Sequence, residues 1–233
     1  MKITVLGSGG WGTALAMLLA ENGHRVTLWS FLEEESRQLQ QTGENPLLPG
    51  VKLPAELTCT WDLSCVQGCD VVVMATPSFG VRATAERIKD KLTPATILVS
   101  VSKGIEKGTS LRMTEIIRQA TGDLCPVVAL SGPSHAEEVG RHVPTGVVAA
   151  SEDLELARQV QDLFMNPRFR VYTSTDKVGT DKYVREFWSM EDNTSEDITI
   201  DEKLSAHGFY EVDSIDEDGV YTLKDYDLSL RHI

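Results

Sequence analysis

The chain has 233 residues, 41% of them hydrophobic, and a formal net charge of −13. This length allows one large domain, or one domain with an appendage, and the apolar fraction is typical of a globular protein. No apolar stretch is long enough to span a bilayer, and an acidic chain without basic clusters argues against nucleic acid as a partner. The charge is uneven, because acids outnumber bases by 15 to 5 in residues 181–233 but only by 20 to 17 before them.

The first twenty residues carry the strongest local pattern in the chain. Residues 3–6 are an apolar run that predicts a buried strand, and residues 13–20 are rich in Ala, Leu and Met, which favours a helix. Gly7-Ser8-Gly9-Gly10-Trp11-Gly12 lies directly between them. A G-x-G-x-x-G motif in a strand–turn–helix frame predicts a dinucleotide-binding site.

Each glycine of the motif has a separate physical task. Gly7 allows the tight turn out of the strand, and Gly9 lets a pyrophosphate approach the backbone because it has no Cβ. Gly12 lets the helix pack closely on the strand. The free N–H groups at the start of that helix are then expected to face the anion.

Residues 25–29 predict the second strand, whose end meets the adenosine ribose in dinucleotide-binding folds. An acid there accepts the 2′-hydroxyl of NAD, whereas a base nearby accommodates the 2′-phosphate of NADP. This chain has Ser30-Phe31, then three glutamates at 33–35, with Arg37 as the nearest base. The glutamates suit the first turn of a helix, so the sequence leaves NAD and NADP as alternatives.

Strands and helices then alternate along the chain. Apolar runs predict strands, and the stretches between them predict helices: strands at 57–60, 70–75, 96–101, 127–130, 145–150 and 169–172, and helices at 81–91, 111–119 and 154–164. Asn45 to Gly50 contains breakers and predicts a loop. Such alternation predicts an α/β protein with a Rossmann-like, doubly wound parallel sheet over residues 1–180.

Ligands of doubly wound sheets bind beyond the carboxyl ends of the strands. That rule selects the glycine loop and three further segments, Pro77-Ser78, Ser102-Lys103-Gly104 and Gly132-Pro133-Ser134. Lys103 follows an apolar strand and precedes a glycine, so it is well placed to meet an anion. The alternative for Lys103 is an ordinary surface lysine.

Two further features bear on compartment and metal binding. The N-terminus begins as a strand and does not resemble a signal peptide. Cys59, Cys65, Cys69 and Cys125 form no C-x-x-C pair, and we interpret them as small buried thiols in a reducing cytoplasm. We predict no metal site.

Several spaced motifs together resemble NAD(P)-dependent sn-glycerol-3-phosphate dehydrogenase, especially the bacterial enzymes. The motifs are Gly-Ser-Gly-Gly-Trp-Gly-Thr-Ala at 7–14, Leu28-Trp29, Asn45-x-x-Leu48-Pro49-Gly50, Pro77-Ser78 with Arg82, Ser102-Lys103-Gly104-Ile105-Glu106 and Ser131-Gly132-Pro133-Ser134-His135-Ala136. The resemblance covers residues 1–180. It implies a cytoplasmic oxidoreductase that interconverts sn-glycerol 3-phosphate and dihydroxyacetone phosphate for phospholipid synthesis, with NAD or NADP as cofactor.

The resemblance also implies roles for individual residues. It assigns cofactor contacts to Gly10, Trp11, Phe31, Lys103 and Ala136. It assigns contacts with the phosphorylated substrate to Lys103, Gly132 and Ser134. These join Gly7, Gly9 and Gly12, which the motif alone selects.

Residues 181–233 depart from the family pattern. The family continues into a helical domain that carries its acid/base lysine in a Gly-Gly-x-x-Lys-Asn motif, which is absent here, so the catalytic residues stay unknown. We interpret 181–190 as a short helix, 191–197 as a linker, and 209–215 and 219–226 as two strands of a hairpin. The sequence therefore predicts two domains, 1–180 and 181–233, the second an unrelated acidic tail.

Three functions remain open at this point. The first is the dehydrogenase activity that the resemblance implies. The second is a nucleotide-binding module without turnover. The third is a protein–protein adaptor built on the acidic tail, which would require a basic partner. The oligomeric state, including a homo-oligomer, is also left open.

Overall fold

The computed structural model describes residues 1–109, 111–132 and 134–175, and the strands within 183–189, 194–200, 210–215 and 220–225. The chain divides into two compact units, Met1–Thr175 and Asp176–Ile233. That the two parts behave as separate domains in solution stays a prediction.

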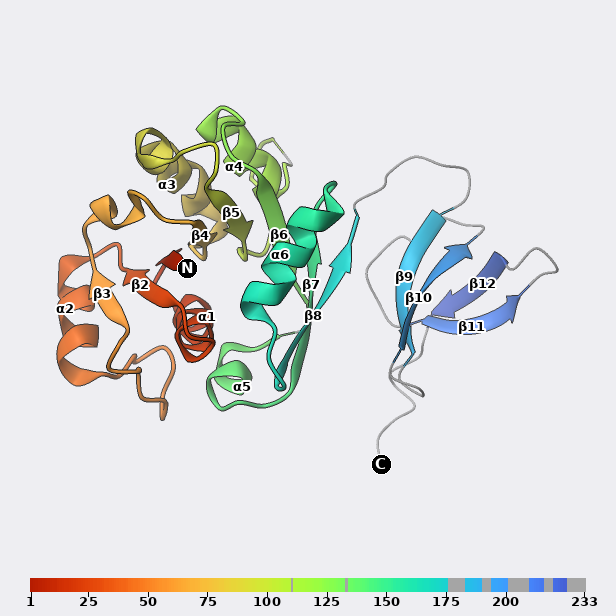
Figure 1. Ribbon diagram of the computed structural model, residues 1–233, viewed down its shortest axis with the longest axis horizontal. Helices are drawn as coiled ribbons and strands as arrows, with labels where there is room; N and C mark the ends of the chain where they lie inside the picture. The colour runs from red at the N-terminus through yellow and green to blue at the C-terminus, as the bar shows by residue number, and fades with distance from the viewer. Residues whose placement is uncertain are drawn as a thin grey trace. The chain divides into compact units, whose positions relative to one another are not determined.

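The first unit is an eight-stranded sheet with helices on both faces (Figure 1). Its strands are β1 (Lys2–Leu6), β2 (Arg25–Trp29), β3 (Thr58–Thr60), β4 (Val71–Met74), β5 (Ile97–Ser100), β6 (Val127–Ser131), β7 (Thr145–Ala150) and β8 (Phe169–Ser174). Its α-helices are α1 (Gly10–Glu21), α2 (Glu33–Thr42), α3 (Val81–Ile88), α4 (Met113–Thr121), α5 (Ala136–Gly140) and α6 (Leu154–Phe164). Short 3-10 turns lie at Leu63–Val66, Ser78–Gly80 and Lys89–Lys91.

The strand order β3-β2-β1-β4-β5-β6-β7-β8 confirms the Rossmann-like sheet. The order reverses between β1 and β4, which pair in parallel, and this is the crevice where such folds bind dinucleotides. One pair differs from the expected all-parallel sheet, because β7 runs antiparallel to β6. The short α5, which the sequence analysis did not predict, lies between these two strands in the chain.

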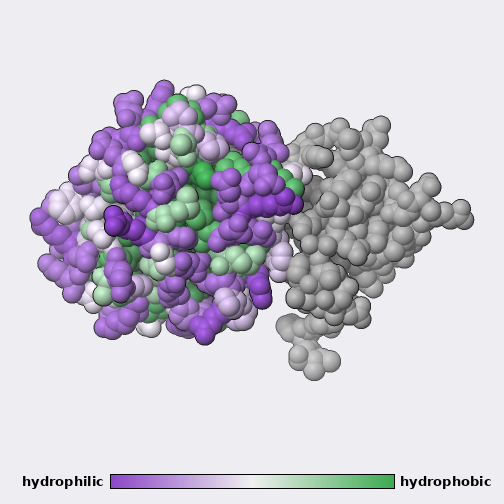
Figure 2. Space-filling model, in the orientation of Figure 1, coloured by the Kyte–Doolittle hydropathy of each residue, from purple (hydrophilic) through white to green (hydrophobic). Residues whose placement is uncertain are grey.

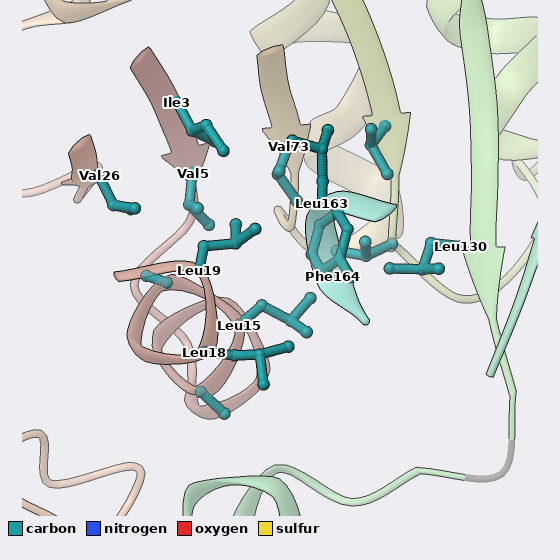
Figure 3. Close-up of a cluster of buried hydrophobic side chains, with 14 of the residues drawn as sticks. Ile3, Val5, Leu15, Leu18, Leu19, Val26, Val73, Leu130, Leu163 and Phe164 are labelled. Carbon is teal, nitrogen blue, oxygen red and sulfur yellow. The ribbon is translucent and has the colours of Figure 1, made fainter. Parts of the chain in front are cut away.

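Two hydrophobic cores hold the helices on the sheet. On one face, α1 and α6 pack their apolar side chains against β1 and β4, with Leu15, Leu19 and Phe164 fully buried (Figure 3). On the other face, α3 and α4 cover the sheet through a second cluster that includes Ile88 and Ile116. Residues of β1 and β4 are buried on both faces, as central strands of a parallel sheet require.

The surface of this unit agrees with a globular fold. Figure 2 shows hydrophilic residues over most of the visible face of the first unit, with a narrow hydrophobic strip between them. No helix in the described part of the chain has the length and apolar character needed to cross a membrane.

The second unit contains a four-stranded sheet of order β11-β12-β10-β9. Its strands are β9 (Tyr183–Ser189), β10 (Thr194–Ile200), β11 (Tyr210–Ile215) and β12 (Val220–Asp225). The predicted hairpin is confirmed, because β11 and β12 pair antiparallel.

Two expectations for residues 181–197 are wrong. The segment interpreted as a short helix holds β9, and the segment interpreted as a linker holds the start of β10, which pairs antiparallel with β9. The β9 sequence contains Tyr, Val, Phe and Trp, and the β10 sequence contains two Thr and two Ile. Such aromatic and β-branched residues favour extended backbone when a partner strand is available.

Candidate functional site

The glycine loop between β1 and α1 makes two close backbone contacts, one with the segment after β4 and one within the loop. Gly7 has a φ of +124°, and a Cβ there would lie 2.6 Å from the carbonyl oxygen of Ala75. A Cβ on Gly12 would lie 2.0 Å from the carbonyl oxygen of Gly7. Both positions therefore require glycine for packing. Gly9 is different, because a Cβ there would meet no atom within 4 Å.

The open space at Gly9 lies at the start of α1. Gly9 is the N-cap residue, with no side-chain cap and no acidic residue in the first helical turn. The first N–H groups of a helix have no partner inside it and carry partial positive charge. The loop thus offers an anion both free donors and room to approach, so the residues present fit a pyrophosphate.

A second loop supports the glycine loop from one side. The buried Asn45 donates from Nδ2 to the carbonyl oxygen of Ser8 at 2.9 Å and to Thr13 Oγ1 at 2.6 Å. The carbonyl oxygen of Leu47 lies 2.6 Å from where a Cβ on Gly10 would be. Gly10 is therefore required for close approach of the two loops.

Three buried polar atoms near the same edge lack partners among the described residues. They are Trp11 Nε1 in the first turn of α1, Ser30 Oγ after β2 and Thr76 Oγ1 shortly after β4. Buried polar atoms are nearly always hydrogen-bonded in native proteins. Their position around the crevice at β1 and β4 is what a site for a polar ligand would produce.

Lys103 connects the predicted substrate and cofactor residues. Its Nζ donates to the carbonyl oxygens of Gly132, at 3.2 Å, and Ser134, at 3.4 Å, and lies 6.0 Å from the centre of the Trp11 ring. An ammonium group has three N–H donors, so one remains for a ligand anion. Ala136 lies beside the glycine loop, with its Cβ 3.4 Å from where a Cβ on Gly10 would be.

The structure thus brings together, at the carboxyl edge of the sheet, most of the residues that the sequence analysis selected. Phe31 lies farther along that edge, just after β2, with 70% of its surface exposed. Its ring makes an edge-to-face contact with Trp29, 6.1 Å between centres, and the Arg87 guanidinium lies 5.7 Å from its centre. An exposed aromatic ring held in this way offers a flat apolar surface.

Sequence reasoning missed one residue of the same kind. Phe79, in the turn after β4, is 90% exposed. The signal was available, because Phe79 directly follows Pro77-Ser78, a segment that the strand-end rule had selected. An exposed aromatic ring at this edge is a further candidate for contact with a planar ligand group.

The loop that carries Lys103 is held by an ion pair. Arg82 on α3 donates from Nε and Nη2 to the two carboxylate oxygens of Glu106, each at 2.7 Å. Thr109 Oγ1 donates to the same carboxylate at 2.6 Å. Hydrogen bonding by Arg82, then by Thr109, lowers the pKa of Glu106 to about 2. The pair joins α3 to the segment between β5 and α4.

These features are typical of one class of protein, the dinucleotide-binding α/β proteins, which bind an anion at the start of the first helix. Residues 2–157 match the family described as NAD-dependent glycerol-3-phosphate dehydrogenase N-terminus. The match covers more than half of the chain, so the chain belongs to this family. The resemblance seen in the motifs is confirmed.

Individual relatives agree with the family assignment. The chain is 45% identical over 184 residues to a glycerol-3-phosphate dehydrogenase [NAD(P)+] of Fusobacterium nucleatum, covering 78% of this chain and 55% of the relative. It is 48% identical over 182 residues to that of Moorella thermoacetica, covering 77% and 54%. A crystal structure of glycerol-3-phosphate dehydrogenase from Coxiella burnetii is similar at a TM-score of 0.70 and 33% identity, covering 74% of this chain and 53% of that one.

The chain spans about half the length of the curated relatives that it matches. The similarity therefore describes the dinucleotide-binding part of those proteins. Within the described residues, no group of three or more His, Cys, Asp or Glu side chains could hold a metal ion.

Proposed function

We propose that this chain binds NAD(H) or NADP(H) at the crevice between β1 and β4, and that it serves the interconversion of sn-glycerol 3-phosphate and dihydroxyacetone phosphate. The observation that carries the proposal is the glycine loop with open space at Gly9 and an uncapped α1. Family membership supports the choice of cofactor. The relatives' names support the choice of reaction.

In this proposal the pyrophosphate lies against the first N–H groups of α1, over Gly9. Gly10, Trp11, Phe31 and Ala136 contact the rest of the cofactor. When bound, the nicotinamide supplies hydride transfer, and the protein orients it at the carboxyl edge of the sheet.

We also propose that the phosphorylated substrate binds beside Lys103, Gly132 and Ser134. The remaining N–H donor of Lys103 Nζ would provide a positive charge to a substrate oxygen, and its two carbonyl partners hold the side chain in place. We further propose a cytoplasmic location, which the family resemblance implies.

The first prediction tests the cofactor site. Gly9→Asp is expected to abolish binding of both NADH and NADPH, because a carboxylate would occupy the place of the pyrophosphate and repel it. Titration of nicotinamide fluorescence measures this. The Gly9 backbone has φ −62° and ψ 168°, which any residue adopts, so the variant is expected to fold with an unchanged circular dichroism spectrum. Equal binding by the variant and the wild type would refute the proposed site.

A second candidate function is a dinucleotide-binding module without turnover. It is favoured by the absence of the family's Gly-Gly-x-x-Lys-Asn motif from these 233 residues and by the strands β9 and β10 where the family resemblance implies helices. The two functions share the cofactor site and differ only in catalysis.

A further inference from the structure

The end of β2 lacks the carboxylate that usually meets the adenosine ribose. Ser30 follows β2, is fully buried, and its hydroxyl has no hydrogen-bond partner among the described residues. In dinucleotide-binding folds, an acid near this point accepts the ribose 2′-hydroxyl of NAD. The structure must therefore supply any such acid from another element.

Glu35 places a carboxylate beside the glycine loop. It lies in the first turn of α2, and its Oε2 accepts from Ser8 Oγ at 3.5 Å. Ser8 is the loop residue between Gly7 and Gly9, so this carboxylate lies between the pyrophosphate loop and the segment after β2. An adenosine ribose has to lie between the same two elements.

The Glu35 carboxylate retains capacity to accept a further hydrogen bond. An ionised carboxylate has about four acceptor positions, and 3.5 Å is long for a hydroxyl–carboxylate bond. Glu35 is exposed and makes no ion pair within the described part of the chain.

Two arginines near this segment, Arg37 and Arg87, already contact other side chains. Arg37 donates to Glu33 at 2.6 Å, and its guanidinium lies 5.7 Å from the centre of the Trp61 ring. The Arg87 guanidinium lies 5.8 Å from the centre of the Trp29 ring and 5.7 Å from that of Phe31. A 2′-phosphate would have to compete for Arg37 with Glu33 while facing Glu35.

We propose that Glu35 accepts the 2′-hydroxyl of the adenosine ribose and makes this chain select NAD(H) over NADP(H). The inference rests on the proposed function and specifies its cofactor. Selection has an attractive part, the hydroxyl–carboxylate hydrogen bond, and a repulsive part, because the same carboxylate faces a 2′-phosphate of like charge.

The test compares cofactor binding by the full chain and two matched variants. Wild type, Glu35→Gln and Glu34→Gln are titrated with NADH and NADPH by nicotinamide fluorescence, and with ADP-ribose and 2′-phospho-ADP-ribose by calorimetry. The second ligand pair removes the nicotinamide, so any preference must arise at the adenosine end. Glu34 is the control because it lies in the same helical turn and is exposed.

We expect wild type and Glu34→Gln to bind NADH and ADP-ribose at least about tenfold more tightly than NADPH and 2′-phospho-ADP-ribose. Glu35→Gln is expected to reduce this preference by about tenfold, through weaker NADH binding and stronger NADPH binding. An Arg37→Gln variant is expected to change NADPH binding less than Glu35→Gln does, because Glu33 already offsets the charge of Arg37.

Three results would overturn the inference and leave the proposed function intact. They are equal or tighter binding of NADPH by the wild type, an unchanged preference in Glu35→Gln, and loss of NADPH binding on Arg37→Gln. Failure of the wild type to bind either cofactor would instead refute the proposed function, and the inference with it.

Discussion

At the scale of single residues, the glycines of the loop divide into two kinds. Packing requires glycine at Gly7 and Gly12, because a Cβ at either position would overlap backbone atoms. Gly9 faces open space and has an ordinary extended conformation. Packing therefore requires two glycines of the motif and does not require Gly9, and substitution separates the two kinds.

We predict that Gly12→Ala lowers the free energy of unfolding by about 2 kcal/mol or more, because the new methyl group would overlap the carbonyl of Gly7. Gly9→Ala is expected to stay within about 0.5 kcal/mol of wild type but to weaken cofactor binding, because its methyl group enters the ligand's space. Urea unfolding and cofactor titration of both variants measure the contrast. Similar free energies of unfolding for the two variants would contradict the prediction, because they would show that the structure can accommodate a methyl group at Gly12.

At the scale of elements, the segment between β5 and α4 is positioned by its ion pair with α3. Lys103 lies at the start of this segment, and Glu106 three residues later accepts from Arg82 and Thr109. The Glu106 pKa is lowered from 4.5 to about 2. A carboxyl group with a lowered folded-state pKa stabilises the fold above its unfolded pKa, and that contribution is lost as the pH falls through the folded pKa.

We therefore predict that wild type exceeds Glu106→Gln in stability at pH 6, and that the difference shrinks as the pH falls from about 4.5 towards 2. Urea unfolding of both proteins at several pH values measures the difference in free energy of unfolding. The pH dependence that comes from all other titratable groups is common to both proteins and cancels in this difference. Glu56→Gln is the control, because Glu56 is exposed and makes no ion pair within the described residues. A pH-independent difference would mean that the charge of Glu106 contributes nothing.

At the scale of the whole molecule, the proposed cofactor site and the proposed substrate contact of Lys103 would not complete a dehydrogenase. Hydride transfer from an alcohol also needs a positioned base for its proton, and general acid–base help is typically worth ~10²–10⁴ in rate. The substrate must be oriented on the nicotinamide as well. The family's acid/base lysine motif is absent from these 233 residues.

We predict that this chain alone reduces dihydroxyacetone phosphate far more slowly than the usual enzymatic range of ~1–10³ per second, although it binds the cofactor. Steady-state kinetics with NADH and NADPH at high protein concentration measure the turnover. A fluorescence titration of the same samples measures cofactor binding. Turnover within that range, lost on Lys103→Ala, would contradict the prediction and imply an unrecognised base in residues 181–233.

Much of the first unit was predictable because its signals are local. The apolar runs of β1 and β4, the glycine loop between β1 and α1, and the strand ends at Lys103 and Ser134 each occupy a few consecutive residues. Hydrophobic periodicity and glycine conformation act over that range. The same local reasoning was wrong for 181–197, because β propensity depends on a partner strand that sequence alone does not place.

The sequence by itself determined the α/β class, the dinucleotide motif and the acidic character of residues 181–233. Only the tertiary structure decided that β7 runs antiparallel to β6, that Asn45 holds the glycine loop, and that Glu35 meets Ser8. Ser8 and Glu35 are 27 residues apart, and no local pattern marks them as neighbours. Such pairs depend on strand order and on how each helix packs on the sheet, and these emerge only when the whole core forms.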